Sequence, residues 1–225
     1  MQKFDIFIPA RVGSQGVPNK NFRKFHRNDC LVDLAVRFAV QLSGIYGSKV
    51  IISTDNSDFL PPVSGQNVRM LDRPPRLSQS DSSQIDLYKY YLSLGQLDPS
   101  RRLLILQPTS PLRTKGFFDQ FMSQCGSKTG NWCSAQLLSV GSHEVFQIDT
   151  QGNPAWISPK ANNGNRQNVD NPELYVEDGM FYFFDLNHLD DRCEPVIIDG
   201  CFMVDIDTWN DWRLARLLYA NLKPL

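Results

Sequence analysis

Two groups of residues, near opposite ends of the chain, have the types and spacing needed for chemistry on a phosphorylated substrate. The first is segment 9–21, a loop that contains two glycines, a serine and the cations Arg11 and Lys20. Glycine lets backbone N–H groups come close to an anion, and the two cations can neutralise it. The second is Asp205-Ile206-Asp207. Residues two apart on a strand point to the same side, so both carboxylates can face one Mg²⁺.

Each of these signals is weak alone. The loop matches neither of the common glycine-rich fingerprints for phosphates and dinucleotides, G-x-x-x-x-G-K-[ST] and G-x-G-x-x-G. A second interpretation of the acid pair makes Asp207 the cap of the last helix and leaves Asp205 solvated. The glycine loop, the acid pair and the alternating strands and helices described next together favour nucleotide chemistry.

The elements that must position these residues alternate between short apolar strands and amphipathic helices. Strands are predicted at 4–8, 50–53, 68–71 and 103–106, and helices at 31–42, 84–94 and 117–122. This alternation predicts an α/β fold with a parallel sheet and helices on both faces. Ligands of such sheets bind at the carboxyl ends of the strands. Polar sequences follow three of these strands, so the rim of an active site is predicted at Arg11 onward, Ser53-Thr54-Asp55 and Gln107 to Arg113.

From about Trp132 the pattern changes to strand-like segments without long helices. Strands are predicted at 133–140, 145–148, 155–157, 179–184 and 196–198, with Asp205 to Asp207 on a further strand. A final helix is predicted at 210–222, and Thr208 and Asp211 have the spacing of a capping box at its start.

Composition limits the classes of function. The 225 residues, 41% of them hydrophobic, fit a single domain with a full core. A net charge of −1 provides no general attraction to nucleic acid or to an anionic membrane, and no apolar run approaches the length of a membrane span. The five cysteines lack C-x-x-C spacing, so we expect reduced thiols in the cytoplasm.

The same residues resemble a known family. Ile8-Pro9-Ala10-Arg11, followed by residues 13–21, is similar to the signature loop of acylneuraminate cytidylyltransferases, the CMP-sialic acid synthetases. Further matches follow in order along nearly the whole chain: Ser53-Thr54-Asp55, Arg73-Pro74, Leu106-Gln107-Pro108-Thr109-Ser110-Pro111-Leu112-Arg113, Arg166-Gln167 and Asp205-Ile206-Asp207-Thr208. The L-Q-P-T-S-P-L-R block is the most specific of these matches.

The resemblance implies a Rossmann-like nucleotidyltransferase fold with a mainly parallel sheet. It implies transfer of CMP from CTP to the anomeric hydroxyl of an acidic nine-carbon ketosugar, a sialic-acid-like acid used for cell-surface polysaccharide, with release of pyrophosphate. Mg²⁺ held by Asp205 and Asp207 is the implied cofactor. A homodimer is also implied, in which residues 140–185 form a small β-rich lobe for dimerisation and sugar binding, and partners lend residues across the interface.

The resemblance also assigns roles to single residues. Arg11, Lys20 and Asp207 are expected to be catalytic. The nucleotide is expected to contact Ala10, Arg11, Gly13, Asn21, Arg73, Ser82 and Gln84. The sugar is expected to contact Gln107, Ser110, Arg166, Gln167 and Tyr182, although Tyr182 lies in an aromatic strand and fits the core equally well. None of the three histidines suggests a base, which leaves a metal-activated hydroxyl or Asp207 itself.

The chain departs from the family pattern at three places. The loop usually reads G-S-K-G, and Gln15 replaces the lysine, which removes a cation. Segment 78–84 lacks the usual threonine and aspartate run, and Asp178-Gly179-Met180-Phe181-Tyr182 stands where N-G-A-I-Y is typical. Alternative functions are therefore a nucleotidyltransferase for an eight-carbon ketosugar acid, a non-catalytic nucleotide-binding relative and a glycosyltransferase with a D-x-D metal site.

Overall fold

The fold is built around one mainly parallel sheet. The computed structural model describes residues 2–62, 67–138, 145–156, 173–200 and 204–222. Seven of its strands form the sheet, in the order β11-β7-β10-β6-β1-β4-β5. Their bounds are β1 Phe4–Ala10, β4 Val50–Thr54, β5 Val68–Asp72, β6 Arg102–Ile105, β7 Trp132–Leu137, β10 Tyr175–Phe184 and β11 Glu194–Ile197. Only β10 runs antiparallel to its neighbours in this sheet, which confirms the predicted fold class.

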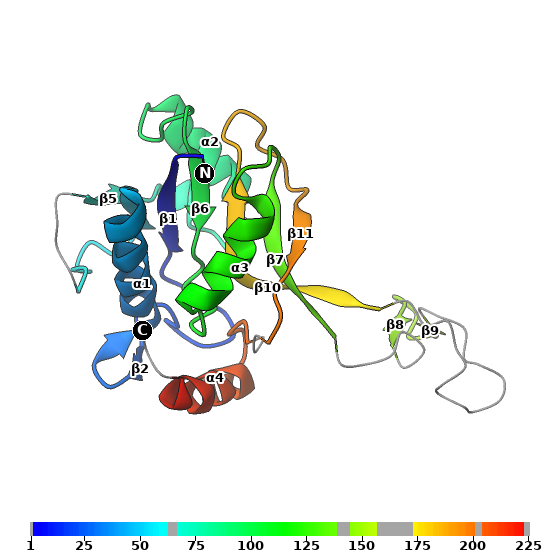
Figure 1. Cartoon of the computed structure of the whole chain (residues 1–225). Coiled ribbons are helices and arrows are strands. Elements are labelled where there is room, and N and C mark those ends of the chain that lie inside the picture. Colours follow the sequence, from blue (N-terminus) through cyan, green and yellow to red (C-terminus); the bar gives the residue numbers. More distant parts are fainter. Residues whose placement is uncertain (1, 63–66, 139–144, 157–172, 201–203, 223–225) are drawn as a thin grey trace.

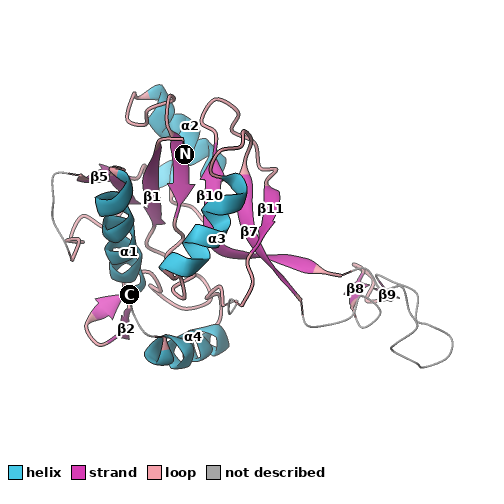
Figure 2. Ribbon diagram, viewed as in Figure 1, coloured by secondary structure: helices cyan, strands magenta, loops and turns pink. Residues whose placement is uncertain are grey.

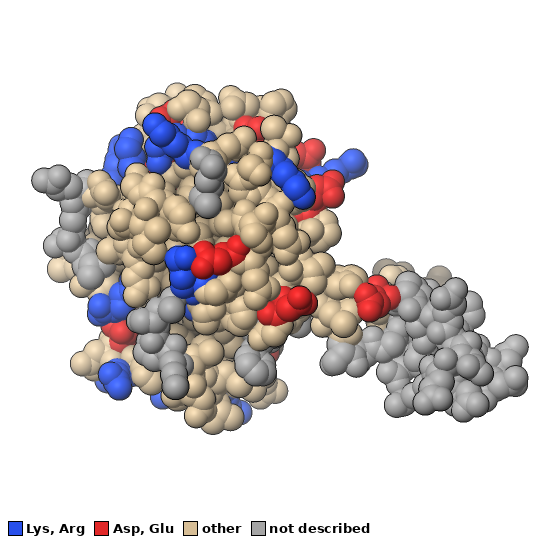
Figure 3. Space-filling view, viewed as in Figure 1, with Lys and Arg blue, Asp and Glu red and all other residues tan. Residues whose placement is uncertain are grey.

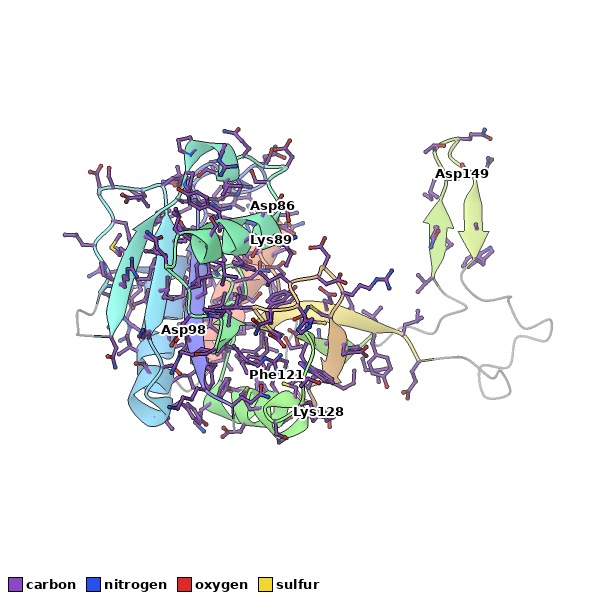
Figure 4. The ribbon with its side chains drawn as sticks, turned by 90° about the horizontal axis from the view of Figure 1, so that it is seen from above. Asp86, Lys89, Asp98, Phe121, Lys128 and Asp149 are labelled. Atoms are coloured by element: carbon purple, nitrogen blue, oxygen red, sulfur yellow. The ribbon has the colours of Figure 1, made fainter. Side chains whose placement is uncertain are left out.

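Helices cover both faces of the sheet. Helices α1 (Leu31–Tyr46) and α3 (Lys115–Cys125) pack against one face, and α2 (Gln84–Ser93) packs against the other. Figure 4 places Asp86 and Lys89 of α2 on one side of the strands and Phe121 of α3 on the other. Alternate residues of β1 supply the two cores, since Ile6 and Ile8 face α1 and α3 while Phe7 contacts Tyr88 of α2.

Helix α4 (Trp209–Asn221) lies apart from the sheet faces, below α1 and α3 in Figure 1. Its Trp212 joins a third apolar cluster with Val17 of the opening loop and Ile206 between the two acids. The predicted capping box is present, because the Thr208 hydroxyl accepts from the Asp211 N–H and the Asp211 carboxylate accepts from the Thr208 N–H. The helix therefore anchors the acid segment to the opening loop.

Several predicted boundaries were wrong, including the ends of α1 and β1. Helix α1 does not end at Ser43-Gly44 but continues to Tyr46, where Gly47 adopts a left-handed conformation and donates its N–H to the Ser43 carbonyl. Strand β1 does not break at Pro9 but extends to Ala10, with Pro9 opposite Ser53 of β4. Proline is tolerated there because it lies near the end of the strand.

The second half of the chain adds the edge of the sheet and a projecting arm. Strands β7 and β10 extend beyond the body toward a separate hairpin of β8 (Phe146–Ile148) and β9 (Pro154–Trp156) (Figure 1, Figure 2). Asp149 lies in the turn at the tip of this hairpin, away from the body (Figure 4). One antiparallel pair at residues 24–30, formed by β2 (Lys24–His26) and β3 (Asp29–Cys30), completes the described strands.

Asp205 to Asp207 do not form a strand, in contrast to the prediction. The segment still alternates, since Val204 and Ile206 are buried and the two acids are exposed. It is held by a different contact, in which the Ile206 N–H donates to the Thr109 carbonyl at 2.9 Å. The prediction that both carboxylates share one side therefore holds without a sheet.

Among the described residues, no helix is both long and apolar enough to cross a membrane. Charged side chains on the face shown in Figure 3 lie in small groups of both signs, separated by wide uncharged areas. The four described cysteines are unpaired, and Cys30, Cys125 and Cys133 are buried.

Candidate functional site

The carboxyl ends of the three adjacent strands β1, β4 and β5 bring their polar segments together. Ala10 of β1, Thr54 of β4 and Asp72 of β5 stand in register, so the residues that follow them are neighbours. The Asp55 carboxylate accepts from the Val12 N–H at 2.7 Å, and the Arg73 N–H donates to the Thr54 carbonyl at 2.9 Å. Asp55 therefore ties the opening loop to the neighbouring strand.

The opening loop also contacts the distant acid segment directly. The Lys20 ammonium donates to the Asp207 carboxylate at 2.8 Å and to the Ile206 carbonyl at 2.5 Å. A Cβ placed on Gly16 would lie 1.9 Å from the Asp207 carbonyl oxygen, so only glycine fits at this approach. The two groups singled out from the sequence thus form one site, although 187 positions separate Lys20 from Asp207.

A cleft lies between these segments, and most of the predicted site residues line it. Predicted residues on its walls are Arg11, Lys20, Asn21, Arg73, Ser82, Gln84, Gln107, Asp205 and Asp207. The cleft also contains residues that the sequence analysis did not select: Pro9, Ser14, Gln79, Ser80, Pro108 and Thr109. All six flank selected residues within motifs already quoted, so proximity in the sequence was the signal that could have found them.

Three cations line the cleft, and each has a partner. Arg11 donates to the Gly13 carbonyl at 3.0 Å. Arg73 is buried and donates to the Leu77 carbonyl at 2.8 Å, and burial lowers the pKa of its guanidinium while the nearby Asp55 carboxylate acts in the opposite direction. With the two acids included, the charged side chains of the described cleft carry a net charge of +1. The cleft is therefore suited to an anion.

Asn21 and the start of α2 supply the neutral polar wall. Asn21 is buried and donates from its amide nitrogen to the Arg11 carbonyl at 2.9 Å, but its amide oxygen has no hydrogen-bond partner among the described residues. Such a group is costly unless a ligand or water donates to it. Ser82 donates to the Arg76 carbonyl at 3.1 Å, and the side-chain amide oxygen of Gln84 accepts from the Tyr88 hydroxyl at 2.7 Å.

Other predicted residues do not line the cleft. Ala10 is a buried residue of β1, and Gly13 is exposed with a φ of +85°. Ser110 lies beneath Asp205 and donates to its carboxylate at 3.4 Å. Tyr182 stacks on Phe184 and donates to the Glu177 carboxylate at 3.2 Å, and burial raises the pKa of its hydroxyl. Arg166 and Gln167 lie outside the described residues.

A buried polar layer supports the acid pair from below. Arg113 donates to the carbonyls of Met180, at 2.7 Å, and of Gln107, so it joins the Gln107 loop to β10. Burial lowers the pKa of its guanidinium to about 9, although Asp178 and Asp205 act in the opposite direction. Asp178 is 1% exposed, and one of its carboxylate oxygens has no hydrogen-bond partner among the described residues. Burial therefore raises the pKa of Asp178, against the opposing effects of Ser134, the Met180 N–H and Arg113.

The acid pair has the donor set for a hard divalent cation. Asp205 and Asp207 are exposed on the same side of their segment and both line the cleft. Within the described residues, no group of three or more His, Cys, Asp or Glu side chains could hold a metal. Two carboxylates with the remaining positions open suit Mg²⁺ bound jointly with phosphate oxygens and water.

The histidines do not contribute to the described cleft. His26 packs on Tyr219, and His188 is 81% exposed at its side chain and contacts Asp185 at 3.3 Å. His143 lies outside the described residues. The exposed carboxylates of Asp205 and Asp207 are therefore the candidate proton acceptors in the described part of the cleft.

Comparison with known proteins identifies relatives of this chain. Residues 6–112 match the family model described as cytidylyltransferase. Over 220 residues the chain is 26% identical to N-acylneuraminate cytidylyltransferase from Streptococcus agalactiae serotype V, and this match covers 91% of the chain and 50% of that protein. It is 32% identical over 222 residues to the enzyme of the same name from Escherichia coli, covering 95% of the chain and 51% of that protein. The chain thus spans about half the length of the curated relatives it matches.

Solved structures share the fold at lower sequence identity. A CMP:2-keto-3-deoxy-manno-octonic acid synthetase complexed with CTP matches 97% of the chain and 99% of its own, with a TM-score of 0.58 and 16% identity. A 2-C-methyl-D-erythritol 4-phosphate cytidylyltransferase from Francisella tularensis matches 96% and 99%, with a TM-score of 0.64 and 11% identity. These likenesses establish the shared α/β fold.

Proposed function

We propose that this chain, a homologue of the N-acylneuraminate cytidylyltransferases, transfers CMP from CTP to the anomeric hydroxyl of a sialic-acid-like 2-keto sugar acid and releases pyrophosphate. The observation that carries the proposal is the single cleft in which the loop cations Arg11 and Lys20 face the acid pair. A site for nucleotidyl transfer needs both, because the triphosphate must be neutralised on the leaving side and positioned on the reacting side.

The reaction requires positioning more than covalent help from the protein. The anomeric oxygen attacks the α-phosphorus, an O–P bond forms, and the bond from that phosphorus to the bridging oxygen of pyrophosphate breaks. Arg11 and Lys20 are the residues proposed to stabilise the negative charge on the departing pyrophosphate. The hydroxyl proton passes to a carboxylate of the acid pair or to water beside it.

The polar wall of the cleft supports a role in nucleotide recognition. The free amide oxygen of Asn21 can accept a hydrogen bond from a hydroxyl or amino group of the nucleotide. Arg73, Ser82 and Gln84 lie around the same cleft and are proposed to contact the cytidine. Gln107, in the L-Q-P-T-S-P-L-R block, also lines the cleft and is proposed to contact the sugar. Arg166 would pair with the carboxylate of the sugar acid.

The acid pair is proposed to hold Mg²⁺. Asp205 and Asp207 would each supply a carboxylate oxygen, and the triphosphate would supply further ligands. When bound, the ion would neutralise phosphate charge and polarise the α-phosphate. This requirement fits the cleft, whose charged side chains alone carry a net charge of only +1.

We also propose that the projecting arm, which consists of the outer ends of β7 and β10 and the β8–β9 hairpin, mediates a homodimer in the cytoplasm. Several large apolar side chains on the arm are exposed, including Ile148 at 65%, Phe146 at 46% and Trp156 at 43%. Exposed apolar groups that cluster on a projecting element are typical of a protein interface. Sedimentation velocity should therefore give a dimer, and Ile148→Asp should shift it toward the monomer.

A substrate panel tests the function. The chain is incubated with Mg²⁺, one of CTP, UTP or GTP, and one of several nine-carbon or eight-carbon ketosugar acids, and pyrophosphate is measured. We expect release with CTP and a nine-carbon acid. Release with only the eight-carbon acid would reassign the substrate, and binding of CTP without release in any combination would indicate a non-catalytic relative.

A further inference from the structure

The Lys20 side chain is in direct contact with the acid segment. Its ammonium lies 2.8 Å from an Asp207 carboxylate oxygen and 2.5 Å from the Ile206 carbonyl oxygen. The lysine side chain is 13% exposed, whereas that of Asp207 is 74% exposed. The cation therefore reaches the acid from the protein side of the cleft and leaves the rest of the carboxylate open.

The surrounding structure fixes this placement. Gly16 packs its backbone on the Asp207 carbonyl, and Val17 is buried in the same apolar cluster as Ile206. The Lys20 N–H then donates to the Val17 carbonyl at 3.1 Å, which sets the lysine at the end of the turn. The loop and the acid segment are thus joined by packing as well as by the ion pair.

The two other cations of the cleft do not take this position. Arg11 donates to the carbonyl of Gly13 in its own loop, and Arg73 donates to the carbonyl of Leu77. Lys20 is therefore the cation that pairs with Asp207 among the described residues of the cleft. A divalent ion bound to the same oxygen of Asp207 would have to displace the ammonium or sit beside a like charge.

We propose that the Lys20 ammonium competes with a divalent metal ion for Asp207. The acid pair therefore binds metal weakly until a triphosphate draws the ammonium away. Phosphate oxygens offer the ammonium stronger and more numerous acceptors than one carboxylate, and the flexible lysine stem permits the exchange. Nucleotide and metal then bind as a coupled pair, and free metal binds weakly. The inference rests on the proposed function, because it assumes that the natural ligand is a triphosphate.

Measurement of metal binding without nucleotide tests whether Lys20 competes with the metal ion. Binding of Mn²⁺, as a probe of the divalent site, is measured by electron paramagnetic resonance on the parent chain, Lys20→Met and Lys115→Met. Lys115 is a matched control, since it forms an ion pair with Asp119 at 2.6 Å and does not line the described cleft. We expect Lys20→Met to bind Mn²⁺ about tenfold more tightly than the parent, because ion pairing and charge repulsion no longer oppose the metal.

A second measurement separates this effect from a structural one. In EDTA, Lys20→Met should bind CTP more weakly than the parent, because the ammonium that moves to the phosphates is missing. Damage to the fold would weaken the binding of both Mn²⁺ and CTP. Competition by Lys20 predicts opposite changes, with tighter binding of Mn²⁺ and weaker binding of CTP. Adding Asp207→Asn to Lys20→Met should remove the gain in Mn²⁺ affinity.

Equal Mn²⁺ affinity of the parent and Lys20→Met would overturn the proposal, as would equal gains in both lysine variants. The outcome is distinct from a failure of the proposed function, which would appear as absent pyrophosphate release by the parent chain with the full substrate panel. A gain in Mn²⁺ affinity in Lys20→Met alongside absent turnover by the parent chain would support competition by Lys20 and reject the proposed cytidylyltransferase activity.

Discussion

The backbone of Gly16 lies against the carbonyl of Asp207, so closely that a Cβ at position 16 would lie 1.9 Å from the carbonyl oxygen. This contact joins the opening loop to the acid segment independently of any side chain. The geometry of the site therefore depends on Gly16, a loop glycine that the sequence suggested for close approach to an anion and that lies against the acid segment in the structure.

Gly16→Ala is expected to impair both stability and activity. The methyl group must push the loop away from Asp207, which we expect to cost about 1 to 3 kcal/mol of unfolding free energy and at least tenfold in kcat/KM. Gly44→Ala is a suitable control, because its Cβ would meet no atom within 4 Å and the residue lies in helix α1. The control should be neutral or slightly stabilising in urea unfolding. A neutral Gly16→Ala variant would contradict the close approach.

The acid pair should determine metal dependence. Asp205→Asn and Asp207→Asn each remove a carboxylate charge with little change in shape, so kcat/KM for pyrophosphate release should fall about 100-fold or more. EDTA should abolish the activity of the parent chain, and added Mg²⁺ should restore it. Asp119→Asn, which alters only an ion pair with Lys115 on α3, should retain parent activity. Parent-like activity of Asp207→Asn would exclude a metal role for that residue.

Asp178 should destabilise the protein increasingly as the pH rises. Burial raises the pKa of its carboxyl in the folded chain, and one carboxylate oxygen has no described hydrogen-bond partner. At a pH below about 4 the group is protonated in both folded and unfolded states, so ionisation has no cost there. As the pH rises from there, the unfolded chain ionises first, so the unfolding free energy falls until the folded-state pKa is passed and then levels off.

Asp178→Asn removes this ionisation while its amide oxygen can still accept from Ser134 and the Met180 N–H. The gain in unfolding free energy over the parent should therefore be larger at pH 8 than at pH 4. Urea titrations of both proteins at the two pH values measure this difference. A gain that is independent of pH would show that the pKa of Asp178 is the same in the folded and unfolded chains.

Gln15→Lys tests the departure in the opening loop. Gln15 is exposed and does not line the described cleft, but it follows Ser14, which does. A lysine there adds a cation at the edge of the triphosphate site, so the KM for CTP should fall about two- to fivefold at low ionic strength. The effect should diminish as salt screens the added charge. An unchanged KM at low salt would show that this position is not needed for the leaving group.

Much of the fold could be predicted from the pattern of apolar residues. The buried strands at 4–10, 50–54 and 102–105 are short runs of mostly apolar residues, and the helices between them repeat at helical spacing. Boundaries were less certain because they depend on local capping. Helix α1 passes through Gly44 since its left-handed terminus is provided by Gly47.

The site was predictable where strand ends supply it. Arg11, Arg73 and Gln107 follow β1, β5 and β6 closely, so the parallel sheet brings them together. Contacts between distant segments were not predictable, because no local pattern records them. The pairing of Lys20 with Asp207 and the position of Ser110 beneath Asp205 both depend on how the loop after β6 packs on the acid segment.

The most direct test of the central claim is identification of the product. The parent chain is incubated with CTP, Mg²⁺ and a nine-carbon ketosugar acid, and CMP-sugar and pyrophosphate are quantified by mass spectrometry and a coupled assay. The account predicts equal amounts of the two products, with none formed when the sugar acid is omitted. Formation of CMP without a sugar ester, or no product with any nine-carbon acid, would contradict it.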